Sequence, residues 1–92
     1  MSTREIWKFT LEEPEESSET IEMPIGSRVL YAREQNDHIR VWALVDPSEP
    51  KEVVRFRLVG TGQEFEPFRT SFIGTFQMHR GETVFHLFRV ND

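Results

Sequence analysis

Residues 71–90 read SFIGTFQMHRGETVFHLFRV, and this stretch decides the fold class. β-Branched and aromatic residues dominate it, and the break Arg80-Gly81-Glu82 divides it into two segments. Side chains of a strand repeat their direction every two residues, whereas those of a helix repeat it every 3.6. The period of two therefore predicts an antiparallel hairpin, with strands at Ser71–His79 and Thr83–Val90 joined through the glycine.

The same period extends outward along the rest of the chain, and no segment has the 3.6-residue period of a helix. Proline- and glycine-containing breaks separate the segments, as expected for turns. The pattern predicts an all-β chain, a small and mainly antiparallel sandwich or partly open barrel of about six strands, in a single domain over residues 1–92. Besides the hairpin, the expected extended segments are Glu5–Leu11, Thr20–Met23 (a short piece), Arg28–Glu34, His38–Asp46 and Glu52–Val59, with an irregular loop at Glu64–Thr70.

Charge is distributed unevenly along the chain. The net charge is −5, residues 1–27 carry all of this excess, and the rest of the chain is balanced. The acidic residues are densest at residues 12–19, where a solvated loop is expected. The alternative is a mimic of nucleic-acid phosphates or a surface for a basic partner. The net charge argues against direct nucleic-acid binding, because neutralising phosphates needs a basic face.

Composition excludes several function classes. Cysteine is absent, so disulfides and thiol chemistry are excluded, and a reducing compartment fits. No apolar run is long enough to span a membrane, and no signal-peptide pattern is recognised. The histidines, His38, His79 and His86, lack metal-ligand spacing, although His79 and His86 would lie on paired strands. No nucleophile elbow or phosphate-binding glycine loop is present. We therefore expect no catalytic residues, no metal, no cofactor and no enzymatic activity.

Several expected strands are apolar on both faces. In His38–Asp46, for example, Ile39 and Val41 alternate with Trp42 and Leu44. An antiparallel sheet with one solvated face should alternate apolar with polar residues. A chain of this length has too little interior to cover both faces of three strands. The pattern therefore predicts self-association, most simply a dimer; the alternative is a monomer with exposed apolar side chains.

Four residues form the candidate ligand site. Arg40 and Trp42 share one face of their strand, and Arg55 and Arg57 share one face of the strand expected to pair with it. Guanidinium groups bind phosphate through paired hydrogen bonds, and an indole stacks on a base, so this set suits a small anionic nucleotide. The alternative is that the arginines form weak surface ion pairs with Glu34, Glu52 and Glu64.

The chain also resembles a family of small proteins of unknown function that is frequent in bacteriophage genomes. The resemblance covers nearly the whole chain and rests on IWKF (6–9), TIEMP-x-G (20–26), WALVDP (42–47), GTG (60–62), FIGTFQ (72–77) and VFHLF (84–88). It implies phage or prophage origin, a β-rich domain and action in the host bacterial cytoplasm, and it carries over no catalytic residue.

Small acidic phage proteins commonly act by stoichiometric binding. The resemblance therefore implies a non-enzymatic protein that counteracts host antiviral defence, by sequestering a nucleotide signal in a pocket between copies. One alternative is an inhibitor of a host defence protein, or a DNA mimic, that acts through the acidic loop. Another is a small structural component of the virion.

Overall fold

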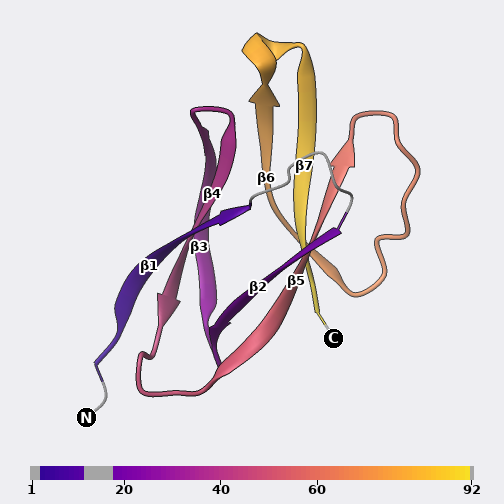
Figure 1. Cartoon of the computed structure of the whole chain (residues 1–92). Coiled ribbons are helices and arrows are strands. Elements are labelled where there is room, and N and C mark those ends of the chain that lie inside the picture. The colour runs from indigo at the N-terminus through magenta and orange to yellow at the C-terminus, as the bar shows by residue number, and fades with distance from the viewer. Residues whose placement is uncertain (1–2, 12–17, 92) are drawn as a thin grey trace.

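The computed structural model describes residues 3–11 and 18–91. This part of the chain forms seven strands and a single 3₁₀ turn, η1 (His79–Gly81), and all strand pairs are antiparallel (Figure 1). The prediction of an all-β chain is confirmed. The strands are β1 (Glu5–Leu11), β2 (Ser18–Pro24), β3 (Arg28–Gln35), β4 (His38–Val45), β5 (Lys51–Gly60), β6 (Thr70–Met78) and β7 (Thr83–Val90).

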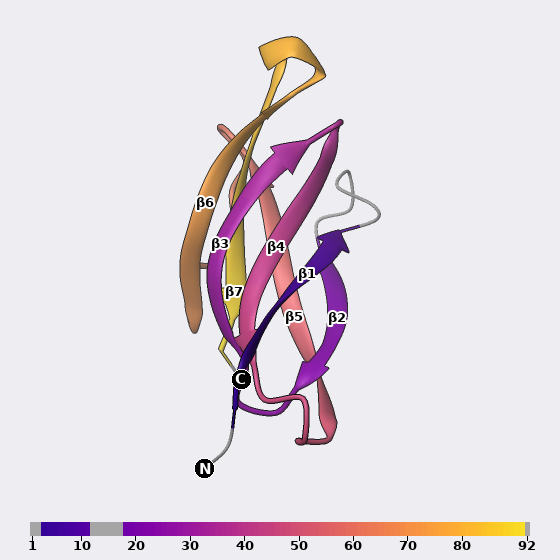
Figure 2. The ribbon, with the colours of Figure 1, turned by 90° about the vertical axis from the view of Figure 1, so that its left-hand side faces the viewer.

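The strands form two sheets that pack as a sandwich. The first sheet has the order β1-β4-β3, and the second has the order β2-β5-β7-β6. Figure 2 shows the first sheet in front of the second, so that its outer face is turned toward the viewer. The inner faces bury a core that includes Val41 of β4, Phe56 of β5 and Leu87 of β7. The sheets are not closed into a barrel, so the sandwich form of the prediction is the one observed.

The hairpin expected at residues 71–90 is present, and a second hairpin joins β3 to β4. β6 and β7 are joined by η1, where Arg80 and Gly81 have φ of 59° and 87°. β3 and β4 are joined through Asn36 and Asp37, with φ of 53° and 61°. Two successive residues with positive φ give a turn whose twist matches that of the flanking strands, and Asn and Asp tolerate this conformation best after glycine.

The strand count and the acidic loop differ from the prediction. The short piece expected at Thr20–Met23 is the seven-residue strand β2, which pairs with β5 along its whole length. Polar and apolar side chains alternate in β2, and its length was underestimated because Ser18 and Glu19 were assigned to the acidic loop. Residues 12–17 of that loop lie outside the described residues.

The expected pairing of β4 with β5 is wrong. β4 lies between β1 and β3, so both of its edges are occupied, and β5 lies between β2 and β7 in the other sheet. The connection at residues 46–50 contains Pro47 and Pro50, and it carries the chain from one sheet to the other instead of turning it back into a hairpin. This difference separates the predicted site residues.

The edges of the two sheets leave a seam between β3 and β6. These strands contact one another but share no ladder of hydrogen bonds (Figure 2). Each has a register shift, between Val29 and Tyr31 in β3 and between Phe72 and Gly74 in β6. Bulges of this kind bend a strand and end its regular pairing, and they occur preferentially at sheet edges and beside functional sites.

Candidate functional site

The outer face of the first sheet has an aromatic centre. Lys8 of β1 and Tyr31 of β3 lie directly opposite Trp42 of β4, one on each side. The rings of Tyr31 and Trp42 are 6.1 Å apart between centroids and are inclined by 42°. Tyr31 is 58% exposed and Trp42 is half-buried, so this pair presents aromatic surface to solvent beside a lysine ammonium group.

The next row of the same face places two arginines opposite each other. Arg40 of β4 lies between Thr10 of β1 and Arg33 of β3. Arg40 Nη1 donates a hydrogen bond to Thr10 Oγ1, and Arg40 Nε is buried without a partner among the described residues. Like charges directly opposite on neighbouring strands destabilise a sheet. An anion between the two guanidinium groups would remove that cost.

This surface is basic although the protein is acidic. Arg28 lies in the third row, where it is opposite Leu44. Asp46, which follows β4, forms a 2.6 Å ion pair with Arg4. Within residues 3–11 and 18–91, no carboxylate pairs with the remaining cations of this face. We call this surface the Trp42 face, and it consists of Lys8, Arg28, Tyr31, Arg33, Arg40 and Trp42.

Asp46 is held in its charged form at the edge of the Trp42 face. The hydroxyl and the backbone N–H of Ser48 donate hydrogen bonds to Asp46 Oδ1, at 2.6 and 3.0 Å. These bonds lower the pKa of Asp46, and the charge and hydrogen bond of Arg4 lower it further. A hydrogen bond to the ionised form favours that form, as does a nearby positive charge.

The four predicted site residues separate into two pairs. Arg40 and Trp42 belong to the Trp42 face, whereas Arg55 and Arg57 lie on β5, opposite Thr20 and Ser18 of β2. Val54, Phe56 and Leu58 of β5 are buried, so the alternate residues Arg55 and Arg57 point to the outer face of the second sheet. The expectation that one sheet presents all four is therefore wrong, because the pairing of β4 with β5 on which it depended is absent.

Phenylalanines gather on the outer face of the second sheet. Phe88 of β7 lies opposite Phe72 of β6, with ring centroids 5.5 Å apart. Phe65, from the loop between β5 and β6, packs on Phe88 at 4.8 Å. In this phenylalanine cluster (Phe65, Phe72 and Phe88), Phe72 is 60% exposed, and Phe68 of the same loop is 76% exposed. Several large rings therefore remain in contact with solvent on a monomer.

His86 lies between two threonine hydroxyls. His86 lies opposite Thr75, and its two ring nitrogens are within hydrogen-bond distance of the Thr75 and Thr61 hydroxyls, at 2.9 and 2.8 Å. The register therefore places Thr75 and not His79 beside His86. No group of three potential metal ligands occurs among the residues that the structure describes.

Four members of the Trp42 face were missed by sequence reasoning, namely Lys8, Arg28, Tyr31 and Arg33. The available signal was the Asn36-Asp37 turn. A two-residue turn at that position fixes the register of β3 against β4 and places Arg33 opposite Arg40 and Tyr31 near Trp42. Lys8 could not be placed, because nothing in the sequence shows that β1 pairs with β4.

Comparisons with known proteins place the chain in a family. Within the described ranges, no helix has the length and apolar character needed to cross a membrane. No curated protein and no solved structure matches the chain. Over residues 2–92 it matches the model of a family described as a domain of unknown function (DUF7352). The chain therefore belongs to the DUF7352 family.

Proposed function

We propose that this protein is a non-enzymatic binding protein for a small anionic, ring-bearing ligand of the nucleotide type, and that the ligand binds on the Trp42 face. The observation that carries the proposal is the row of Arg33 and Arg40, two opposed cations without a carboxylate partner among the described residues. This row lies beside the exposed ring of Tyr31 and the half-buried ring of Trp42.

The row of Arg33 and Arg40 suits the anionic part of such a ligand, and the row of Tyr31 and Trp42 suits its ring. A guanidinium group offers planar, paired N–H donors to phosphate oxygens, and these charge-assisted bonds are stronger than neutral ones. A base stacked on an aromatic side chain contributes about 1–3 kcal/mol. The face contains no acid–base pair or nucleophile with a polarised partner, and this favours binding over catalysis.

The biological form of the proposal rests on the resemblance to phage proteins. In that setting the protein acts in the host bacterial cytoplasm and counteracts antiviral defence by sequestering a nucleotide signal. Sequestration requires only affinity and a sufficient number of copies, and it needs no cofactor. Tight binding without turnover is the property that the Trp42 face is proposed to supply.

The proposal also includes self-association, which we assign to the outer face of the second sheet. The phenylalanine cluster offers exposed aromatic surface, and aromatic residues are enriched in the interfaces of protein complexes. A dimer formed through this cluster leaves the Trp42 face of each copy accessible. Arg55 and Arg57 then lie beside the interface and do not contact the ligand.

The test is a fluorescence titration in a Trp7→Phe background, which leaves Trp42 as the only indole. Cyclic nucleotides, ADP-ribose and a short single-stranded oligonucleotide are added separately, so that free and polymeric nucleotides are distinguished. We expect saturable quenching by a free nucleotide. The variants Arg33→Gln and Arg40→Gln are each expected to raise Kd about tenfold, which corresponds to about 1.4 kcal/mol.

Arg55→Gln and Arg57→Gln are the matched controls, and neither should change Kd. If these two variants weaken binding as much as the first two, the pocket lies between copies, as the sequence alone suggested. If no nucleotide changes the emission at about 1 mM, the proposal of a small ligand is wrong, because excess ligand must populate the complex.

A further inference from the structure

A cavity lies in the seam between the two sheets, and Arg28, a member of the Trp42 face, is among the residues that line it. It has a volume of about 400 Å³ and is lined by residues 27–30 of β3 and the preceding turn, residues 71–73 of β6, Arg89 of β7 and Asn91. The bulges of β3 and β6 face each other here. Leu30 in β3 and Ile73 in β6 are the bulged residues, which have no partner residue on the neighbouring strand of their sheet. The cavity exists because the bulged edges do not pair.

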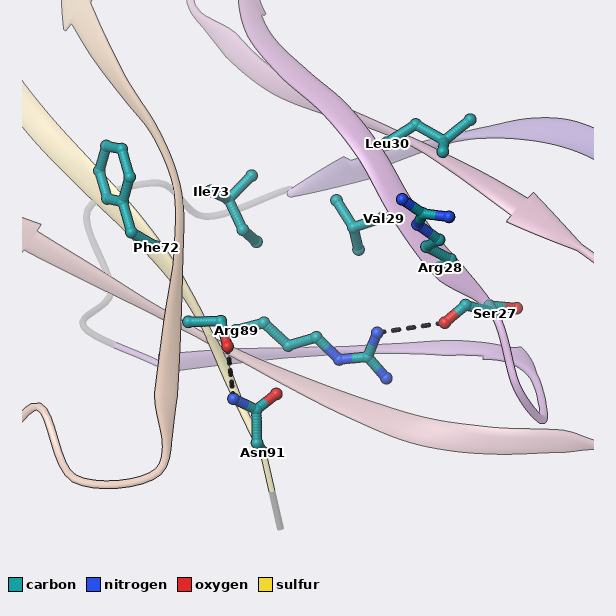
Figure 3. A pocket seen from close by; sticks show the side chains of 9 residues that line it. Ser27, Arg28, Val29, Leu30, Phe72, Ile73, Arg89 and Asn91 are labelled. Atoms are coloured by element: carbon teal, nitrogen blue, oxygen red, sulfur yellow. Dashed lines mark hydrogen bonds between the residues drawn. The ribbon is translucent and has the colours of Figure 1, made fainter.

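Arg89 places a positive charge inside this cavity. Its side chain is on the inner face of β7, and it extends across the space between the sheets toward Ser27 (Figure 3). Arg89 Nη1 donates to the Ser27 backbone carbonyl at 3.2 Å. No carboxylate of residues 3–11 or 18–91 pairs with this guanidinium group, and most of its five N–H donors have no protein partner there.

The rest of the cavity is apolar on its walls and polar near its floor. Val29 and Ile73 face each other across it, and Leu30 and Phe72 lie at its rim, where they are 45% and 60% exposed (Figure 3). Asn91 Nδ2 donates to Ser71 Oγ at 2.6 Å beside Arg89. A half-buried cation below apolar walls is complementary to a molecule with one anionic end and an apolar body.

We propose that this seam cavity binds a small organic anion, with its carboxylate or phosphate group on Arg89 and its apolar body between Val29 and Ile73. The volume lies near the lower end of the range for ligand pockets, so the ligand is smaller than a dinucleotide. The site shares Arg28 with the Trp42 face but contains neither the row of Arg33 and Arg40 nor the rings of Tyr31 and Trp42, so either proposal can fail without the other.

The experiment is a titration of the full-length protein followed by the backbone amide signals in two-dimensional NMR. The probes are phenyl phosphate and phenylacetate, which distinguish the two anionic groups, with inorganic phosphate and benzyl alcohol as controls that each lack one half of the ligand. We expect saturable shifts at residues 28–30 and 71–73. The better of the two aromatic anions should bind at least about tenfold more tightly than either control.

Two variants test the geometry. Arg89→Gln should weaken binding of the preferred anion about tenfold or more, since it removes the charge. Because Arg89 also bridges the sheets, a second variant, Leu30→Glu, places a carboxylate at the exposed rim and should weaken binding at least about fivefold. Ile6→Glu on the outer face of the first sheet is the matched control and should leave Kd unchanged.

Three results would overturn the proposal. The first is shifts confined to residues 8, 31 and 42, which would place the probes on the Trp42 face. The second is equal affinity for phenyl phosphate and inorganic phosphate together with no binding of phenylacetate, which would indicate attraction by surface charge alone. The third is an unchanged Kd in a folded Leu30→Glu variant. A Trp42→Ala variant that loses nucleotide binding but keeps the seam shifts would separate the two sites.

Discussion

The outer faces of the two sheets are both antiparallel but differ in their central side chains. In the first sheet the outward positions of the central strand, β4, hold Arg40 and Trp42, and cations of the neighbouring strands surround them. In the second sheet the outward positions of β7 hold His86 and Phe88, and Phe88 is covered on two sides by other phenylalanines. An overall charge of −5 therefore coexists with a basic face, because the excess of acidic residues lies in residues 1–27. Net charge alone is a poor guide to what a small protein binds.

The largest expected effect concerns self-association. Phe72 and Ile6 are both 60% exposed, one on each outer face, so Phe72→Ser and Ile6→Ser are matched variants. Sedimentation equilibrium at micromolar concentration should give twice the chain mass of 10.9 kDa for the unmodified protein and for Ile6→Ser. Phe72→Ser should weaken the dimer at least about a hundredfold, as expected for a central aromatic contact. A single-chain mass for the unmodified protein would remove the assignment of the phenylalanine cluster as an interface.

A change in ionic strength should affect nucleotide binding and dimer formation differently, and the expected effect is intermediate in size. The proposed binding on the Trp42 face would depend on attraction between phosphate groups and the cations Lys8, Arg33 and Arg40. Raising salt from about 50 mM to about 200 mM should weaken nucleotide binding roughly five- to tenfold, as for two phosphate contacts. The proposed dimer, which would depend on apolar burial, should be unchanged or slightly stronger. The measurement is Kd by fluorescence and mass by sedimentation in the same buffers, and a parallel loss of both would contradict the separation of the two surfaces.

The smallest expected effect concerns Asp46, the carboxylate at the edge of the Trp42 face. The pKa of Asp46 is lowered from its ordinary value of 3.8, mainly by Ser48. A carboxyl group whose pKa is lower in the folded state stabilises it fully above the ordinary pKa, and that contribution is lost as pH falls through the lowered value. Asp46→Asn should therefore lower the urea midpoint slightly at about pH 6, and the difference should disappear near about pH 2. A difference that does not change with pH would show that the Asn side chain, and not the lost charge, is responsible.

Much of the fold could be predicted from the sequence, because the evidence for it is local. Periodicity and the break at Arg80-Gly81-Glu82 defined the hairpin of β6 and β7, and Arg80 and Gly81 have the positive φ values that its turn requires. The assignment of strands to sheets could not be predicted, because the pairing of β1 with β4 and of β2 with β5 joins segments that are far apart in sequence. The same distinction between local signals and the pairing of distant strands applies to the candidate site. Arg40 and Trp42 were placed on one face by their spacing, whereas Arg55 and Arg57 were placed wrongly by the assumed pairing.

The route of the chain between the two sheets has a consequence for how the protein folds. β1, β3 and β4 make one sheet and β2, β5, β6 and β7 make the other, so neither is a continuous piece of sequence. No fragment ending before β5 contains a complete sandwich, and most contacts join residues distant along the chain. Contacts of this kind are formed only after loop closure has lowered the chain entropy, which makes assembly slow and cooperative. The domain is therefore expected to acquire its structure in one late step, after synthesis has passed β7.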